Sequence, residues 1–568
     1  MRPIIDAVLF DVGGTLKRST RHTEAERRES LASLNALLGT HLTGEEWDER
    51  LLPRAREYKR WAEESCGEIP EEDFWTRWML PEFPAELVRP RALDLHRAWR
   101  RAFATAEMLP QADRVVRELI RRGYRLGVIS NTSSRTEAPE LLERYGILDC
   151  FDVVILSAVH GKRKPDPLPF ELATHSMEIA PERCAFIGNR RDTDLAGARR
   201  AGFAEVVLLR RPEVRAGDSQ ADGLAPDHWI DGLDELLTIF PPRFRIRALG
   251  PRRSAKPSGA RWKASISTMW GSPAFPRLDG FLQSAAEMGF SGVELNHEVD
   301  SAMLAAANLE PYRFNTVHEP SPADVGTGRM AVLDWQLSSE DEQKRQQAVR
   351  MAKRSIYLAC DVGAGLVVVH PGNVRGDRAL EKDLRTLFNT GEIDSERGRR
   401  LREQFIHHRS QLAGPRVEAA LRSLSELLAC AREEGILLGL ENRYHYLDIP
   451  TPDEMDELLA CGDPSELGLV YDVGHAQTME RLGFFTHEEW LQRFSDRIVE
   501  VHLHDVKGVD DHLAPGLGEV DFDRIASRLP RSALRTCELR PQNTPGQVAE
   551  GMEYLIQHGC VEALGPTG

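Results

Sequence analysis

The chain has 568 residues, of which 41% are hydrophobic and 29% charged, as in ordinary globular proteins. A chain of this length is too long to fold around a single hydrophobic core, so we expect about two to four domains. Its formal net charge of −16 disfavours non-specific binding of nucleic acid, which needs clustered lysine and arginine. The net charge does not exclude a local basic surface. The eight scattered cysteines and the lack of a membrane-spanning run or signal peptide predict a cytoplasmic protein that does not act in a membrane.

The first third of the chain alternates predicted strands with helical patterns, and polar motifs follow the strands. The apolar run at residues 7–10 ends in the sequence DVGGT, which begins with Asp11, and the run at residues 126–129 ends in the sequence SNT, which begins with Ser130. An acid at a strand tip followed by two glycines lets backbone amides close around an anion beside a carboxylate. The alternating order predicts an α/β fold with a doubly wound parallel sheet.

Two further motifs, KPDP from Lys164 and GNRRDTD ending at Asp194, complete a set that resembles the haloacid dehalogenase (HAD) superfamily over about residues 5–240. The resemblance implies that Asp11 is the catalytic nucleophile and that Lys164 neutralises charge beside it. It also implies that Ser130 and Asn131 contact the substrate, and that Asp11 and Asp194 hold Mg²⁺.

Two positions depart from the pattern of the phosphatases in that superfamily. Gly13 stands where they carry an acid that protonates the leaving group, and Asn189 stands where they carry a metal-binding aspartate. Both changes weaken phosphatase chemistry, because the leaving alkoxide lacks a proton donor and the metal site loses a charge. A weak phosphatase, a dehalogenase-like activity and a silent domain that only binds a phosphorylated ligand all remain open.

The domain boundaries follow from composition. We expect a HAD-like domain at residues 1–242, whose tryptophan-rich stretch at about residues 17–103 forms a helical cap with the tryptophans in its core. Residues 243–262 are basic, contain Pro, Ser and Gly, and lack apolar periodicity, so they predict a linker. Residues 263–568 form the second predicted domain.

The second domain contains eight apolar runs, each followed by a helical pattern or the chain end, which is the count that a closed (β/α)₈ TIM barrel requires. The predicted strands are residues 264–268, 292–295, 314–317, 365–369, 436–440, 468–471, 498–501 and 535–537. A charged insertion at about residues 373–415 follows the fourth run, and we expect it to form extra helix near the barrel mouth that could act as a lid.

Histidines and acids follow six consecutive strands of this predicted barrel. Burying so many carboxylates together is costly unless a cation compensates them, and mixed histidine and carboxylate ligands suit Zn²⁺, Mn²⁺ or Co²⁺. These residues are His318, His370, Glu441, Asp472, His475, His502, Asp510, His512 and Glu538.

This half resembles the xylose isomerase-like barrel superfamily, which includes sugar and sugar-phosphate isomerases and epimerases as well as endonuclease IV. The resemblance implies that Glu441, Asp472, His502 and Glu538 hold a shared metal ion. In the epimerase branch Glu441 and Glu538 would also move the proton, and His475 would contact the substrate. We further expect Arg443 and Arg540, each two residues after one of these glutamates, to bind substrate.

The endonuclease IV branch uses a cluster of three metal ions, and candidates for its further ligands are His318, His370, His475, Asp510 and His512. The ligands thus favour multinuclear hydrolysis, while the net charge favours small substrates.

We therefore predict a bifunctional enzyme: a metal-dependent sugar or sugar-phosphate isomerase or epimerase barrel, fused to a HAD-type phosphatase-like domain. Its partners would be small, sugar-like or phosphorylated molecules. The alternative is an endonuclease IV-like zinc phosphoester hydrolase with a degenerate HAD domain.

Overall fold

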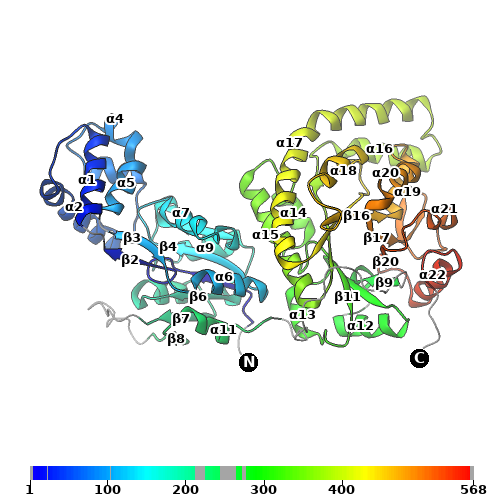
Figure 1. The fold of residues 1–568 in the computed structure, drawn as a ribbon, viewed down its shortest axis with the longest axis horizontal. Coiled ribbons are helices and arrows are strands. Elements are labelled where there is room, and N and C mark those ends of the chain that lie inside the picture. The colour runs from blue at the N-terminus through cyan, green and yellow to red at the C-terminus, as the bar shows by residue number, and fades with distance from the viewer. Residues whose placement is uncertain are drawn as a thin grey trace. The chain divides into compact units, whose positions relative to one another are not determined.

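The computed structural model describes residues 4–21, 24–102, 104–210, 224–243, 264–271, 275 and 277–562. The chain divides into two compact units, Met1–Pro242 and Arg243–Gly568, which are blue to teal and green to red in Figure 1. The predicted linker at residues 243–262 lies outside the described residues except for Arg243. Within the described ranges, no helix combines the length and the apolar character needed to cross a bilayer.

The first unit is built on a six-stranded sheet with the order β5-β4-β1-β6-β7-β8, in which every neighbouring pair is parallel. Successive residues of β1 point to opposite faces: Val8 and Phe10 pack on one side, and Ala7 and Leu9 on the other. Both faces are covered, so the predicted doubly wound sheet is confirmed. The strands are β1 (Ala7–Phe10), β4 (Arg125–Ser130), β5 (Val153–Leu156), β6 (Cys184–Gly188), β7 (Glu205–Leu209) and β8 (His228–Ile230).

Helices cover the two faces of this sheet. Val115 of α6 packs with Val8 in one apolar cluster, and Phe170 of α9 packs with Leu9 in the other. The helices are α6 (Ala112–Arg121), α7 (Glu137–Arg144), α8 (Ser157–His160), α9 (Leu168–Ser176), α10 (Ala196–Arg200) and α11 (Leu236–Ile239).

A helical segment leaves the sheet after β1 and returns through an antiparallel ribbon of β2 (Lys17–Arg21) and β3 (Ala104–Met108). It has its own apolar core, in which Trp47 and Trp75 are fully buried, as the sequence predicts for a cap. Trp99 belongs to this core, and Trp61 and Trp78 pack against it. The cap helices are α1 (Glu24–Leu38), α2 (Gly44–Ser65), α3 (Glu71–Asp73), α4 (Ala85–Val88) and α5 (Ala92–Arg101).

The second unit is a closed barrel of parallel strands in the order β10-β11-β12-β14-β16-β17-β20-β9. Each of the eight predicted strands overlaps an observed one, so the TIM barrel is confirmed. The strands are β9 (Ala264–Ser267), β10 (Gly292–Leu295), β11 (Phe314–His318), β12 (Leu366–Val369), β14 (Leu437–Glu441), β16 (Leu467–Asp472), β17 (Ile498–Leu503) and β20 (Leu534–Cys537).

Helices surround the barrel and connect its strands. They are α12 (Leu278–Glu287), α13 (Ser301–Ala306), α14 (Thr327–Leu333), α15 (Glu342–Val362), α16 (Arg378–Asn389), α17 (Glu396–Glu434), α18 (Pro452–Leu459), α19 (Val473–Leu482), α20 (His487–Phe494), α21 (Phe522–Ala526) and α22 (Pro545–Gln557).

The insertion after β12 contains α16 and the first half of the 39-residue helix α17. Leu384 and Phe405 of these helices form a small apolar cluster with Met479 of α19, the helix that follows β16. Arg409 of α17 is buried and hydrogen-bonds both carboxylate oxygens of Glu454, at 2.6 and 2.8 Å. The insertion is therefore packed against the segments that follow β14 and β16, at the carboxyl ends of the strands.

Candidate active sites

Four polar side chains from four barrel strands meet at the C-terminal mouth of the barrel. Glu441 ends β14, Asp472 ends β16, His502 lies near the end of β17 and Glu538 follows β20. His502 Nδ1 lies 2.8 Å from Glu441 Oε1, 3.2 Å from Glu538 Oε2 and 3.7 Å from Asp472 Oδ2. All four are buried, and each offers one ligand atom within 4.8 Å of the others. The set can hold one divalent cation.

The charges in this group compensate one another. Burial raises the pKa of Glu441, but Arg443 and hydrogen bonds from His370 and His502 bring that pKa well below its usual value. Burial lowers the pKa of His502, but Glu294 and Glu538 raise it well above its usual value. Three clustered carboxylates thus stay ionised because cationic side chains contact them.

A second group, His318, His370 and Glu441, shares Glu441 with the first. His370 Nε2 lies 2.8 Å from Glu441 Oε2, and the rings of His318 and His370 meet edge to face with their centroids 4.4 Å apart. The guanidinium of Arg443 contacts both His370 Nε2 and Glu441 Oε2. A positive charge is therefore already present in this group, and a second metal ion would have to displace it.

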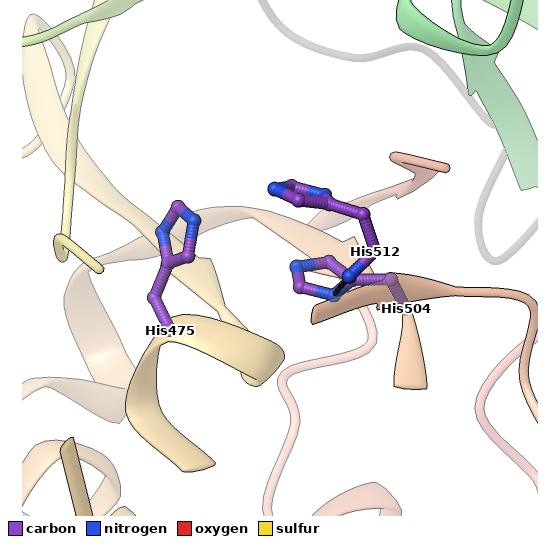
Figure 2. Close-up of side chains that lie close together, drawn as sticks. All are labelled: His475, His504 and His512. Atoms are coloured by element: carbon purple, nitrogen blue, oxygen red, sulfur yellow. Dashed lines mark hydrogen bonds between the residues drawn. The ribbon is translucent and has the colours of Figure 1, made fainter. Parts of the chain in front are cut away.

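A third group consists of His475, His504 and His512, which come from three different segments (Figure 2). His475 lies in the first turn of α19, His504 follows β17, and His512 belongs to β19 (Asp510–Leu513), which pairs with β18 (Asp505–Lys507). The rings of His504 and His512 stack with centroids 4.1 Å apart, and the His475 ring faces that of His512 at 5.6 Å.

His504 connects this third group to the first. Its Nε2 donates to Asp472, 3.0 Å from each carboxylate oxygen, and its Nδ1 accepts from the backbone N–H of His512 at 2.9 Å. Because both ring nitrogens are engaged, His504 acts here as a support that orients Asp472.

Geometry explains two positions of the sequence DVGH at the end of β16, Asp472 and Gly474. Asp472 caps α19 by accepting a hydrogen bond from the His475 backbone N–H at 2.6 Å. A Cβ at Gly474 would lie 2.0 Å from Cε1 of His504, so only glycine lets the His504 ring approach Asp472. Asn442 fixes the same turn, since its amide nitrogen donates to the Asp472 carbonyl at 2.9 Å.

The structure does not bring Asp510 into any of these groups. Its carboxylate is exposed and accepts a hydrogen bond from the Arg540 guanidinium at 2.8 Å. The carboxylate of Asp511 lies 3.6 Å from His512 Nε2 and 3.9 Å from His475 Nε2. His512 adopts a left-handed backbone with φ of 57°, which breaks the strand alternation on which a D-x-H pattern depends.

Sequence reasoning missed His504, Asp511 and a pair of glutamates inside the barrel. Glu294 of β10 lies 3.2 Å from His502 Nε2, and Glu500 of β17 accepts from the Thr316 hydroxyl at 3.3 Å. Burial and Glu294 raise the pKa of Glu500 to about 8. The sequence could have identified Glu500, because it stands two residues before His502 and alternation along a strand places both side chains on the same face.

The first unit gathers the HAD-like residues at the carboxyl end of its sheet. Lys164 Nζ lies 2.7 Å from Asp11 Oδ1 and 2.8 Å from Asp194 Oδ1, and the Thr15 hydroxyl donates to Asp11 Oδ2 at 3.2 Å. Burial raises the pKa of Asp11 above its usual value even though Lys164 lowers it. One buried ammonium thus joins the two carboxylates.

The donor set beside Asp11 fits a magnesium ion. Asp194 Oδ2 accepts from the backbone N–H groups of Asn189 and Arg190, at 2.9 and 3.0 Å, and this fixes its carboxylate. Asn189 Oδ1 is buried and has no hydrogen-bond partner among the residues that the structure describes. That oxygen, with Asp11 and Asp194, gives the oxygen ligands that Mg²⁺ prefers, although Asn189 adds no charge.

A cavity of about 1190 Å³ lies within the first unit and is lined by Val12, Gly13 and Gly14 of the loop that follows Asp11. Asn131 also clamps the backbone of Lys164, since its side chain accepts from Lys164 N at 2.8 Å and donates to Lys164 O at 2.9 Å. The cavity is lined by residues of the sheet loops and of the cap, among them Gly13, Lys17, Ser130, Asn131, Phe74, His96, Trp99 and Arg100.

Known proteins match both units. A haloacid dehalogenase-like hydrolase model matches residues 5–202, and a model of the xylose isomerase-like TIM barrel matches residues 282–558. Glyceraldehyde 3-phosphate phosphatase of Methanopyrus kandleri is 30% identical over 237 residues, which are 97% of that protein and 42% of this chain. The chain belongs to the haloacid dehalogenase-like hydrolase family. Its second unit is a xylose isomerase-like TIM barrel.

Solved structures are similar to each unit separately. For the xylose isomerase-like barrel, a D-tagatose 3-epimerase-like protein is 22% identical with a TM-score of 0.37, covering 52% of this chain and 96% of that one. For the HAD unit, a 2-haloacid dehalogenase from Pseudomonas syringae pv. Tomato DC3000 is 22% identical with a TM-score of 0.32, covering 42% of this chain and 98% of that one.

The contact between Gly474 and His504 generates a prediction. The variant Gly474→Ala should displace the His504 ring, free Asp472 to reorient and weaken divalent-metal binding by the xylose isomerase-like barrel about 10- to 100-fold. Competition with a chromogenic chelator measures this affinity. Gly365→Ala is the matched control, because a Cβ at Gly365 meets nothing within 4 Å. Equal affinities of the wild type and Gly474→Ala would contradict the supporting role of His504.

Proposed function

We propose that the barrel is a divalent-metal-dependent isomerase or epimerase of a sugar or sugar phosphate. The observation that carries this proposal is the buried group of Glu441, Asp472, His502 and Glu538, whose ligand atoms lie within 4.8 Å of one another. Glu441 and Glu538 belong to strands separated by two others in the barrel order, so they flank His502. Two carboxylates on either side of one metal position suit proton transfer at both faces of a carbon.

The residues of the group divide the reaction between them. The pKa values of Glu441 and Glu538 lie well below the usual value, so both carboxylates are ionised at neutral pH and can accept a proton. Zn²⁺, Mn²⁺ or Co²⁺ bound there would polarise the substrate carbonyl and so acidify the neighbouring C–H bond. One glutamate removes that proton and becomes a carboxylic acid, which can return the proton to the adjacent carbon in an isomerisation. In an epimerisation the other glutamate must first take a proton from solvent and then deliver it to the opposite face of the same carbon. Asp472 and His502 keep the two glutamates in position.

The second candidate for the barrel is a multinuclear phosphoester hydrolase of the endonuclease IV type. It is favoured by the adjacency of the three groups, since the second shares Glu441 with the first and His504 of the third contacts Asp472. Two observations count against it: Arg443 already supplies a cation between His370 and Glu441, and Asp510 is bonded to Arg540. The net charge of −16 also disfavours a nucleic-acid substrate. We therefore favour an isomerase or epimerase over a phosphoester hydrolase for the barrel.

For the HAD unit we propose a Mg²⁺-dependent phosphatase that acts on a small phosphorylated metabolite. The support is the arrangement of Asp11, Lys164 and Asp194, together with the unpartnered amide oxygen of Asn189 among the described residues. The relative from Methanopyrus kandleri is named a glyceraldehyde 3-phosphate phosphatase, which suggests a sugar-phosphate-like substrate. We further propose that both units work in the cytoplasm on related metabolites, an argument that rests on their fusion alone.

Proton exchange tests the barrel assignment. In D₂O with Mn²⁺, Co²⁺ or Zn²⁺, the full chain should incorporate deuterium at a carbon next to the carbonyl of a ketose or a ketose phosphate, as read by ¹H NMR. Glu441→Gln and Glu538→Gln should each lower this exchange by at least about 100-fold, because each removes a proton-transfer group.

The matched control is Asp510→Asn, whose carboxylate lies outside the three groups and should leave exchange within about threefold of wild type. Cleavage of an abasic-site duplex without any exchange on sugars would contradict the isomerase assignment and support the hydrolase.

Phosphomonoester hydrolysis tests the assignment of the HAD unit. With Mg²⁺ present, Asp11→Asn should lower turnover of a sugar phosphate by at least about 1,000-fold, because an amide cannot form the covalent intermediate. Asp6→Asn is the control, since Asp6 precedes β1 and its carboxylate contacts Arg183 at the other end of the strand. A wild type with no activity would leave the unit as a binding module, and an Asp11→Asn variant as active as the wild type would contradict the role of Asp11 as the nucleophile.

A further inference from the structure

Gly13 occupies the position where HAD phosphatases carry the acid that protonates the leaving group. Its backbone does not require glycine, because its φ lies outside the left-handed region and an added Cβ meets nothing within 4 Å. Gly13 also lines the cavity of the first unit. Space for a proton donor is therefore present at the nucleophile loop, and the question is which side chain reaches it.

Lys17 lies opposite Gly13 in the same loop. The two residues form an isolated β-bridge, the Lys17 N–H donates to the Val12 carbonyl at 2.9 Å, and the Gly14 N–H donates to the Lys17 carbonyl at 2.8 Å. Lys17 is only 8% exposed and lines the same cavity as Gly13 and Ser130. A buried ammonium is thus fixed to the loop that carries the nucleophile.

The ammonium of Lys17 is held by Glu137, the first residue of α7, and Glu137 also contacts Arg100 of the cap helix α5 at 2.5 Å. Burial lowers the pKa of Lys17, although Glu137 and, more weakly, Asp11 raise it. The charged groups that face this ammonium are therefore Glu137, Arg100 and Asp11, and their net effect leaves a lysine that gives up a proton more readily than an exposed one.

We propose that Lys17 is the proton donor to the leaving group in the HAD unit, in the place of the acid that is absent at Gly13. The proposal rests on the phosphatase function proposed above. It adds a catalytic residue on the cap-bearing ribbon, β2, outside the four motifs that define the resemblance.

The step balances as follows. Asp11 attacks phosphorus, the bond between phosphorus and the ester oxygen breaks, and its electron pair goes to the leaving oxygen. Lys17 Nζ gives that oxygen a proton, so the products are a neutral alcohol, an aspartyl phosphate and a neutral Lys17 amine. The amine then takes a proton from the water that attacks the aspartyl phosphate, which restores the Asp11 carboxylate and the ammonium.

Tyr58, Lys59 and His96 of the cap also line this cavity. The Tyr58 hydroxyl is committed to Glu68, and the ammonium of Lys59 is exposed and pairs with Glu63 at 3.8 Å, so the remaining candidate beside Lys17 is His96. It is buried, and neither of its ring nitrogens has a hydrogen-bond partner within the described part of the chain. Burial and Arg100 lower its pKa to about 3, so it is neutral at pH 7 and holds no imidazolium proton to give. The donor role therefore falls to Lys17.

The test compares two leaving groups with the full chain and Mg²⁺. An alkyl phosphate such as glycerol 3-phosphate needs a proton on its leaving oxygen, whereas para-nitrophenolate departs without one. Lys17→Met should lower kcat on glycerol 3-phosphate by about 100-fold and on para-nitrophenyl phosphate by no more than about threefold.

Two further variants separate proton donation from charge and folding. Lys17→Arg keeps a cation for Glu137 but does not release a proton, so it should show the same selective loss on glycerol 3-phosphate. Adding Gly13→Asp to Lys17→Met should restore at least about a tenth of wild-type kcat on that substrate. Arg77→Met is the control, because this cap cation is 71% exposed, pairs with Asp73 and is not among the residues that line the cavity, so both rates should stay unchanged.

Two outcomes would overturn the role of Lys17: equal losses of kcat on the two substrates, or full activity of Lys17→Arg on glycerol 3-phosphate. In either case the phosphatase assignment would stand as long as Asp11→Asn still abolishes hydrolysis. Hydrolysis that is absent in the wild type or unchanged by Asp11→Asn would instead remove the phosphatase assignment, and the role of Lys17 with it.

Discussion

Buried negative charge at the mouth of the barrel is the condition on which the rest of that unit depends. Glu441, Asp472 and Glu538 are 1%, 0% and 4% exposed, and Glu294 and Glu500 lie beside them inside the barrel. Removing carboxylates from water costs several kcal/mol each unless cations and hydrogen bonds compensate. The strand ends, the DVGH turn and the β18–β19 hairpin bring positive or hydrogen-bonding groups to these carboxylates. A divalent cation held by Glu441, Asp472, His502 and Glu538 would add to this compensation.

The HAD unit meets the same condition with a single side chain. Lys164 bridges Asp11 and Asp194 at 2.7 and 2.8 Å, and Asn131 holds its backbone. Both units therefore compensate buried carboxylates with cationic side chains, but they arrange these side chains differently. In the HAD unit one buried ammonium compensates both carboxylates, whereas the barrel distributes its compensation over histidines and Arg443.

Most of the fold was predictable because the spacing of apolar residues along the sequence indicates where strands and helices lie. Eight apolar runs at βα spacing predict eight barrel strands, and β1, β4 and β6 are buried runs that end in polar motifs. The first metal group was predictable for the same reason, since residues after parallel strands meet at one end. The third group was predictable only in part: His475 and His512 were expected as ligands, but the positive φ of His512 leaves Asp510 exposed and brings Asp511 beside the histidines. The compensation by Arg443 was equally hidden, because it depends on which side-chain rotamer reaches His370.

The central claim is that the barrel mouth is built for one metal ion, with Asp472 as a ligand and His475 outside the ligand set. Elemental analysis of the purified full chain after dialysis tests it most directly, with Asp472→Ala and His475→Ala measured beside the wild type. The account predicts one tightly held transition-metal ion per chain, lost in Asp472→Ala and retained in His475→Ala. Three zinc ions per chain, with losses in both variants, would contradict it.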